Sequence, residues 1–121
     1  LVFVEQIQRP EFWKTINGLG DVLFAGLEEI AARSEVPVVF QHHGSRFGIV
    51  FGTRDPVTNY SEALVHDPEL MLEFCRQTTA RGVYFHDYGG GPCHHGYSLA
   101  HTPDDVGQAL TAIEDSLKAM A

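Results

Sequence analysis

Apolar side chains recur at intervals of three and four residues in three stretches of the chain. These stretches cover residues 11–34, 68–81 and the segment from residue 103 onward. Such spacing places the apolar side chains on one face of a helix, so it predicts three amphipathic helices. A shorter turn of helix is expected at residues 62–65, with Ser61 as its N-cap.

The two later helices have clear start signals. Asp67 precedes Pro68 and Thr102 precedes Pro103, which in each case puts an N-cap residue before a proline at the first helical position. Gly82 follows the second helix and is suited to ending it, because glycine adopts the left-handed backbone conformation without strain.

Four short runs rich in branched and aromatic residues predict strands at residues 38–42, 47–51, 83–86 and 96–100. Turn chemistry at residues 43–46 predicts an antiparallel hairpin from the first two runs. The predicted order is therefore α-β-β-α-β-β-α. This order favours an α/β fold of the α+β kind, a single domain over residues 1–121 in which helices cover one face of a small, mainly antiparallel sheet.

Composition excludes several classes of function. The formal net charge is −8 and only eight residues are Lys or Arg, which argues against a nucleic-acid partner. Apolar runs are too short for a membrane span, and the first residues lack the pattern of a signal peptide. Two cysteines, Cys75 and Cys93, make no disulfide framework. A cytoplasmic protein is expected.

The unusual chemistry of the chain is concentrated in one glycine-containing loop between the last two predicted strands. We expect this loop to form one wall of a pocket, because strands can fix a loop that presents polar groups. A second polar cluster, at the hairpin turn, could face it. The candidate pocket residues are His86, Tyr88, Cys93, His94, His95, Ser45 and Arg46.

Catalytic and metal-binding interpretations of this loop are weaker. Adjacent side chains on a strand point to opposite faces, so Cys93, His94 and His95 cannot all bind one ion on a regular backbone. No metal site is expected, and one cysteine near several histidines does not identify a Cys93/His nucleophile pair. His101, beside the third helix start, is expected to be a structural histidine bonded to backbone.

Four ordered motifs, QHHGSRFGIVF, DPVTNYSEAL, RGVYF and SLAHTPDDVGQAL, lie between residues 41 and 110, and the resemblance that they carry covers essentially the whole chain. This set resembles the C-terminal region of class III aminotransferases, and within them the glutamate-1-semialdehyde 2,1-aminomutase group. The resemblance implies the small C-terminal domain of a fold-type I pyridoxal-phosphate enzyme. It also implies an obligate homodimer and an amino acid or amino/keto-acid substrate, bound between this domain and a large domain.

In that family the large domain supplies the Schiff-base lysine. The only lysines here are Lys14 and Lys118, and neither follows a strand in the setting that a buried amine with a lowered pKa needs. We therefore expect no catalytic residue in this segment, no bound pyridoxal phosphate and no transamination by the segment alone. Without the large domain, the apolar residues 1–4 are the first surface that we expect to cause self-association.

Residues 85–97 differ from the family pattern. Members that act on ornithine-like or aminobutyrate-like substrates are expected to carry an arginine there, and aminomutase-like members a Phe-Glu-Ala stretch. This chain has neither. Two alternatives to an aminotransferase domain stay open. One is a stand-alone binding module that uses the His-rich loop for a metal or small ligand, and the other is a domain that only self-associates.

Overall fold

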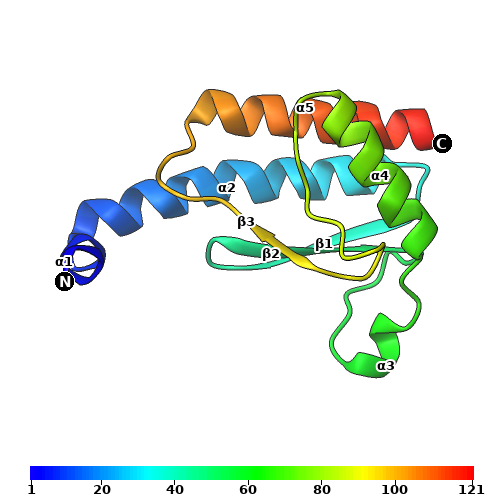
Figure 1. Cartoon of the computed structure of the whole chain (residues 1–121), viewed down its shortest axis with the longest axis horizontal. Coiled ribbons are helices and arrows are strands. Elements are labelled where there is room, and N and C mark those ends of the chain that lie inside the picture. The colour runs from blue at the N-terminus through cyan, green and yellow to red at the C-terminus, as the bar shows by residue number, and fades with distance from the viewer.

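The computed structural model describes residues 1–121, and it arranges them in two layers, with helices on one face of a three-stranded sheet (Figure 1). This confirms the predicted α+β fold with helices on one face. The helices are α1 (Val2–Ile7), α2 (Pro10–Arg33), α3 (Tyr60–Ala63), α4 (Pro68–Ala80) and α5 (Pro103–Met120), and the strands are β1 (Val38–His43), β2 (Arg46–Phe51) and β3 (His94–Gly96). No helix is both long and apolar enough to cross a membrane.

The predicted starts of α4 and α5 are confirmed by their capping bonds. The Asp67 carboxylate accepts hydrogen bonds from the first backbone N–H groups of α4. At α5 the Thr102 hydroxyl accepts from the Asp105 N–H, and the Asp105 carboxylate accepts from the Thr102 N–H at 2.7 Å. These reciprocal bonds form a capping box and satisfy donors that a helix leaves unpaired at its start.

The predicted cap of the short helix is wrong. Asn59, not Ser61, is the N-cap of α3, and its side-chain oxygen accepts from the Glu62 N–H at 3.1 Å. The helix therefore begins at Tyr60, two residues earlier than expected. The Glu62 carboxylate reaches back to the Thr58 N–H at 2.7 Å, which fixes the turn in this register.

The predicted hairpin is confirmed. Strands β1 and β2 pair antiparallel from Val38 opposite Phe51 to His43 opposite Arg46. Gly44 has a φ of 57° at the first central position of the two-residue turn. A type II′ hairpin turn needs positive φ at that position, so glycine is the residue that fits it.

The second predicted pair of strands is only partly present. Residues 83–86 run without strand pairing, and the third strand is β3, His94–Gly96, rather than 96–100. Strand β3 pairs antiparallel with β2, so both edges of β2 are occupied and no place beside it remains for a fourth strand. The apolar pattern of residues 83–86 has another cause, because Phe85 packs into the core against Phe47 and Phe74.

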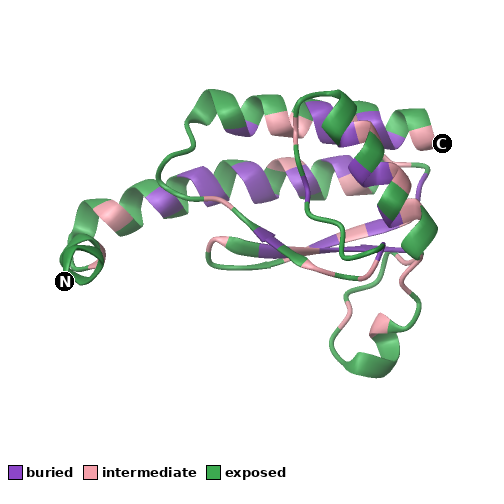
Figure 2. Cartoon of the chain, viewed as in Figure 1, coloured by how far each residue is buried: buried purple, intermediate pink, exposed green.

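The core lies between the helices and the inner face of the sheet (Figure 2). Its most deeply buried side chains come from every long helix and both long strands, which ties the two layers together. They include Leu27, Ile49, Phe51, Met71, Phe74 and Ile113, each with none of its surface exposed. The helical stripes predicted from spacing are therefore the faces that pack on the sheet.

Candidate functional site

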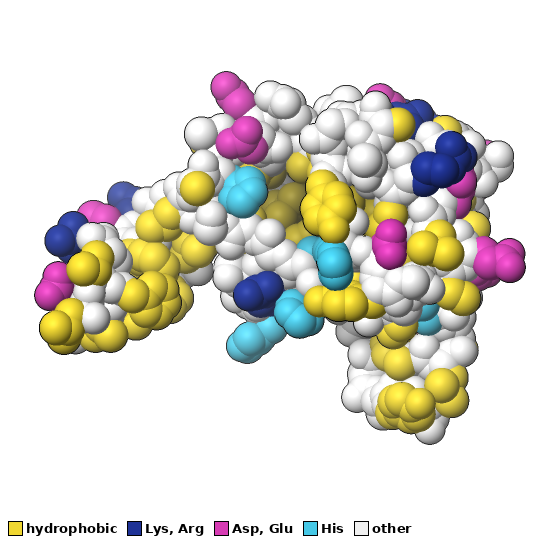
Figure 3. Space-filling model, viewed as in Figure 1, with side chains coloured by type: hydrophobic (Ala, Val, Ile, Leu, Met, Phe, Trp, Pro, Cys, Tyr) yellow, Lys and Arg dark blue, Asp and Glu magenta, His cyan; other side chains and the backbone are white.

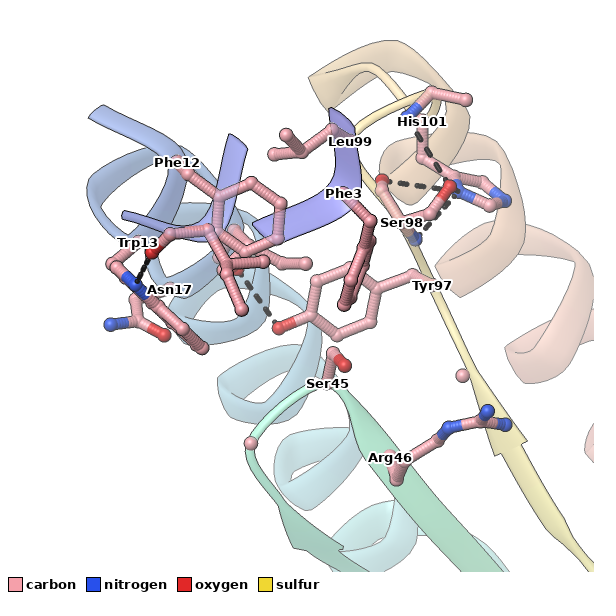
Figure 4. Close-up of a pocket in the computed structure, with 15 residues that line it drawn as sticks. Phe3, Phe12, Trp13, Asn17, Ser45, Arg46, Tyr97, Ser98, Leu99 and His101 are labelled. Carbon is pink, nitrogen blue, oxygen red and sulfur yellow. Dashed lines mark hydrogen bonds between the residues drawn. The ribbon is translucent and has the colours of Figure 1, made fainter. Parts of the chain in front are cut away.

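A cleft of about 810 Å³ opens where α1 and the start of α2 approach the β1–β2 turn and the segment that follows β3. Figure 4 shows aromatic side chains from α1 and α2 on one side and the turn on the other. Most of the lining is apolar. The lining side chains that matter most are Phe3, Phe12, Trp13, Tyr97 and Leu99, with Ser45, Arg46, Ser98 and His101 as polar members.

Two hydrogen bonds fix the walls of the cleft. The Trp13 indole N–H donates to the Ile7 carbonyl at 2.7 Å, which holds α1 against α2. The Tyr97 hydroxyl donates to the Ile16 carbonyl at 2.9 Å, which ties the segment after β3 to α2 (Figure 4). The cleft is thus built from parts of the chain about 80 residues apart in sequence.

The polar rim of the cleft contains no acidic side chain. His101 accepts a hydrogen bond from the Ser98 N–H through Nδ1 at 3.1 Å, which confirms its predicted structural role. Ser45 and Arg46, two of the predicted pocket residues, lie on this rim. Arg46 is exposed, so it places a positive charge at the edge of an otherwise uncharged cleft.

The other five predicted residues lie outside this cleft, in and after the glycine loop. His86 and Tyr88 are exposed and their rings meet edge to face at 4.2 Å. The His86 Nδ1 atom lies 2.8 Å from the Tyr84 hydroxyl. His94 is exposed, whereas His95 is buried, as strand alternation requires. The loop residues therefore divide between an exposed group and a pair formed by the half-buried Cys93 and the buried His95.

In this pair the Cys93 thiol sulfur lies 3.3 Å from His95 Nε2. The thiol also donates to the His86 carbonyl at 2.9 Å. Burial lowers the pKa of His95 to about 4, and the neighbouring His94 and His86 add to this. Burial, together with the Asp87 charge, raises the pKa of Cys93. Both groups are neutral near pH 7, so the thiol is not activated as a nucleophile.

The remaining clusters are structural or dispersed. The His42 ring stacks on Phe24 with ring centroids 3.7 Å apart, on the side of the sheet that α2 covers. Three or more His, Cys, Asp or Glu side chains do not come together anywhere in the fold in a way that could hold a metal ion. Sequence reasoning missed the aromatic lining of the cleft. The only feature of the sequence that could have indicated this lining is the group of apolar residues in and just after the first helix.

Comparison with known proteins adds to this picture. No protein-family model matches the chain. The chain is 34% identical over 110 residues to glutamate-1-semialdehyde 2,1-aminomutase 1 of Staphylococcus epidermidis, covering 89% of this chain and 25% of that protein. It is 32% identical to the enzyme of the same name in Staphylococcus aureus, again over 89% of this chain. The chain belongs to the class III aminotransferase family.

The structural neighbours of this aminotransferase segment agree in fold. The FumI protein of Sphingopyxis sp. MTA144, solved in its PLP internal aldimine form, matches with a TM-score of 0.71 and 22% identity over 96% of this chain. An omega-transaminase from Sphaerobacter thermophilus matches with a TM-score of 0.69 and 20% identity over 91% of this chain. The segment covers about a quarter of each of these longer proteins.

Proposed function

We propose that this chain is the C-terminal small domain of a pyridoxal-phosphate-dependent aminotransferase or aminomutase, similar to glutamate-1-semialdehyde 2,1-aminomutase. The proposal rests on the extent of the sequence match, because nearly all of this chain aligns with only about a quarter of the aminomutase. On this proposal a large domain lies outside these 121 residues and the whole enzyme is a cytoplasmic homodimer.

The lysines of the chain support a division of labour between the two domains. Lys14 is exposed on α2, and Lys118 is exposed on α5, where it pairs with Glu114 at 3.2 Å. Neither fits a covalent linkage to pyridoxal phosphate, which needs a buried amine with a lowered pKa. Pyridoxal phosphate, when bound to the whole enzyme, supplies an electron sink for amino-group transfer. This chain is proposed to contribute no catalytic group and no cofactor site of its own.

The proposed role of the chain is to form one wall of the substrate pocket and to select the substrate. The exposed residues His86, Tyr88 and His94 are available for contact with an amino acid or amino/keto acid, and the Cys93–His95 pair sets the shape of the segment behind them. Ser45 and Arg46 present polar groups from the neighbouring turn. The apolar cleft and α1 are proposed to be covered by the large domain, since Phe3 and Trp13 are both more than half exposed here.

The test uses the longest reading frame that contains this chain. We expect the longer protein to bind pyridoxal phosphate, visible by absorbance, and to transfer or move an amino group. The 121-residue chain should do neither. Absence of cofactor and of amino transfer from the longer protein, or amino transfer by the short chain, would contradict the proposal.

Substrate selection is tested separately in the longer protein. Replacing exposed His94 with Ala should change kcat/KM for some amino donors more than for others while leaving cofactor absorbance unchanged. Thr111→Ala, an exposed change on α5, is the matched control. Equal kcat/KM values for all donors in the His94 variant would remove the loop from the recognition role.

One contact is the basis of a second candidate, a metal-binding module, although it supplies only two ligands and the fold has no group of three or more metal-ligating side chains. Ligand bonds of about 2.3 Å from sulfur and about 2.0 Å from nitrogen to a tetrahedral Zn²⁺ place the two ligand atoms about 3.5 Å apart. The Cys93 sulfur and His95 Nε2 already lie 3.3 Å apart. Calorimetric titration of this chain with Zn²⁺, repeated with Cys93→Ser, decides the matter. Tight binding that the variant loses supports the module, and heat independent of Cys93 excludes it.

A further inference from the structure

The outer face of the sheet, which no helix covers, presents basic side chains to the surface (Figure 1). Residues directly opposite each other in an antiparallel pair share a face of the sheet. His43 is opposite Arg46, Arg46 is opposite Gly96, and Gly48 is opposite His94. Phe47 and His95, one residue along, point into the core. His43, Arg46 and His94 therefore share the outer face.

Two glycines form the floor between these three side chains. Gly48 lies two residues along β2 from Arg46, and Gly96 lies two residues along β3 from His94. A side chain on Gly96 would meet Arg46, because a Cβ there would lie 2.9 Å from the Arg46 Cδ. The Arg46 side chain thus lies across β3. A Cβ on Gly48 would have no contact closer than 3.9 Å, so the floor beside Arg46 is open.

Of the six arginines, only Arg46 and Arg9 have side chains that make no hydrogen bond or ion pair within the chain. Arg33 pairs with the Glu114 carboxylate at 3.3 Å, and Arg76 pairs with the Glu73 carboxylate. Arg54 and Arg81 donate to backbone carbonyls. No hydrogen bond or ion pair joins the Arg46 guanidinium to any other group. Its five N–H donors are left for something outside the chain.

The surroundings of Arg46 also select for an anion. In Figure 3 a cationic side chain lies among histidines, and no acidic side chain lies directly beside it. The cleft that Arg46 borders has no acidic side chain in its lining either. In a chain with a net charge of −8, such a region is an exception. It would attract a negatively charged group that most of the surface repels.

We propose that the outer face of the sheet binds the carboxylate of a small organic acid, with Arg46 as the primary contact and His43 and His94 flanking it over the glycine floor. A guanidinium matches a carboxylate with two parallel hydrogen bonds. A singly charged carboxylate is neutralised by the one full charge of Arg46, whereas a doubly charged phosphate would keep an uncompensated charge at the site. Its source, the amino or keto acid of the enzyme, rests on the function proposed above, whereas the binding itself does not.

The test is a titration of this 121-residue chain with acetate and glutarate, followed by backbone and histidine NMR shifts. Sodium chloride at matched ionic strength and inorganic phosphate are run in parallel. We expect saturable shifts at residues 43, 46, 48, 94 and 96 with both carboxylates and weaker ones with phosphate. Arg46→Gln should weaken carboxylate binding at least about tenfold, the loss of a charge-assisted bidentate contact. Arg9→Gln, another unpaired arginine far from the sheet, should leave it unchanged.

Several outcomes overturn the proposal. They are shifts that chloride reproduces, phosphate binding as tight as carboxylate binding, or carboxylate shifts that persist in Arg46→Gln. Absence of saturation in spectra that show a folded protein also overturns it. None of these results touches pyridoxal-phosphate binding by the longer protein, so failure of this site and failure of the proposed function are distinguishable.

Discussion

The stability of the fold should fall in mild acid because of one histidine. The His95 ring is only 8% exposed and lies against Phe47 and Phe85. Its Nε2 atom faces the Cys93 thiol, and no carboxylate pairs with the ring. A proton added to this ring would place a positive charge in apolar surroundings without a partner. Folding therefore favours the neutral ring.

The size of the effect follows from the pKa of His95, which burial lowers to about 4 from a usual value of about 6.5. Between these values the unfolded chain binds a proton that the folded chain does not. Stability is therefore fully present above pH 6.5 and is lost as the pH falls toward 4. Linkage gives about 2 kcal/mol at pH 5. Because the site lies near the surface and water can relax part of the cost, we expect roughly 1 to 2 kcal/mol.

The assay is chemical denaturation at pH 7 and pH 5 of the parent chain and of His95→Gln, which cannot titrate. The parent should lose roughly 1 to 2 kcal/mol more free energy of unfolding than His95→Gln between the two pH values. His43→Gln, at an exposed position of the same sheet, is the matched control and should behave like the parent. The carboxyl groups of Asp105 and Glu114 stay ionised at pH 5, because hydrogen bonds lower their pKa.

Two results would refute this reasoning. One is an equal loss of stability in the parent and in His95→Gln. The other is an NMR titration of the His95 ring in the folded parent with a midpoint at or above 6.5. The second measurement remains decisive even where the Gln variant folds poorly.

Three further predictions concern the loop and the last helix. Gly90→Ala should lower the free energy of unfolding by more than about 2 kcal/mol, because φ is +84° and the new Cβ would lie 2.6 Å from a backbone carbonyl of α4. Gly89→Ala, where φ is +66° and the space is open, should lower it by only about 1 kcal/mol. Urea unfolding measures both values. Thr102→Ala should lower the free energy of unfolding by about 1 kcal/mol because the N-cap of α5 is lost, while Thr111→Ala on the same helix should lower it less. Equal decreases in melting temperature for the two variants would contradict the capping argument. Alkylation of Cys93 should be slower than that of a free thiol at pH 8 and should accelerate as pH rises, since its pKa is raised; a rate equal to the free thiol would exclude this.

Local signals in the sequence accounted for most of the secondary structure. The Asp67 and Thr102 caps are local interactions between residues two or three apart, so the sequence predicts them well. The hairpin turn at Gly44 is equally local. The run at residues 83–86 misled because burial of Phe85 gives the same apolar pattern as a strand. Pairing of such a run depends on tertiary packing: the outer edges of β1 and β3 are unpaired, yet residues 83–86 join neither and instead place Phe85 in the core.

The candidate site shows the same limit. The types of residue that gather in the glycine loop were evident from the chain, and strand alternation already separated His94 from His95. The unpaired state of Arg46 was not, because it depends on β2 lying beside β3 and on the glycines at 48 and 96.

The sequence by itself determined the starts of α4 and α5, the hairpin, the fold class and the family resemblance, because each rests on short-range spacing or on an ordered set of motifs. The tertiary structure decided which edge of β2 is filled, which histidine is buried, and how α1 and the segment after β3 form a cleft. These features arise from contacts between residues far apart in the chain, such as Tyr97 with Ile16. Only folding determines which distant groups meet and which, like Arg46, are left without a partner.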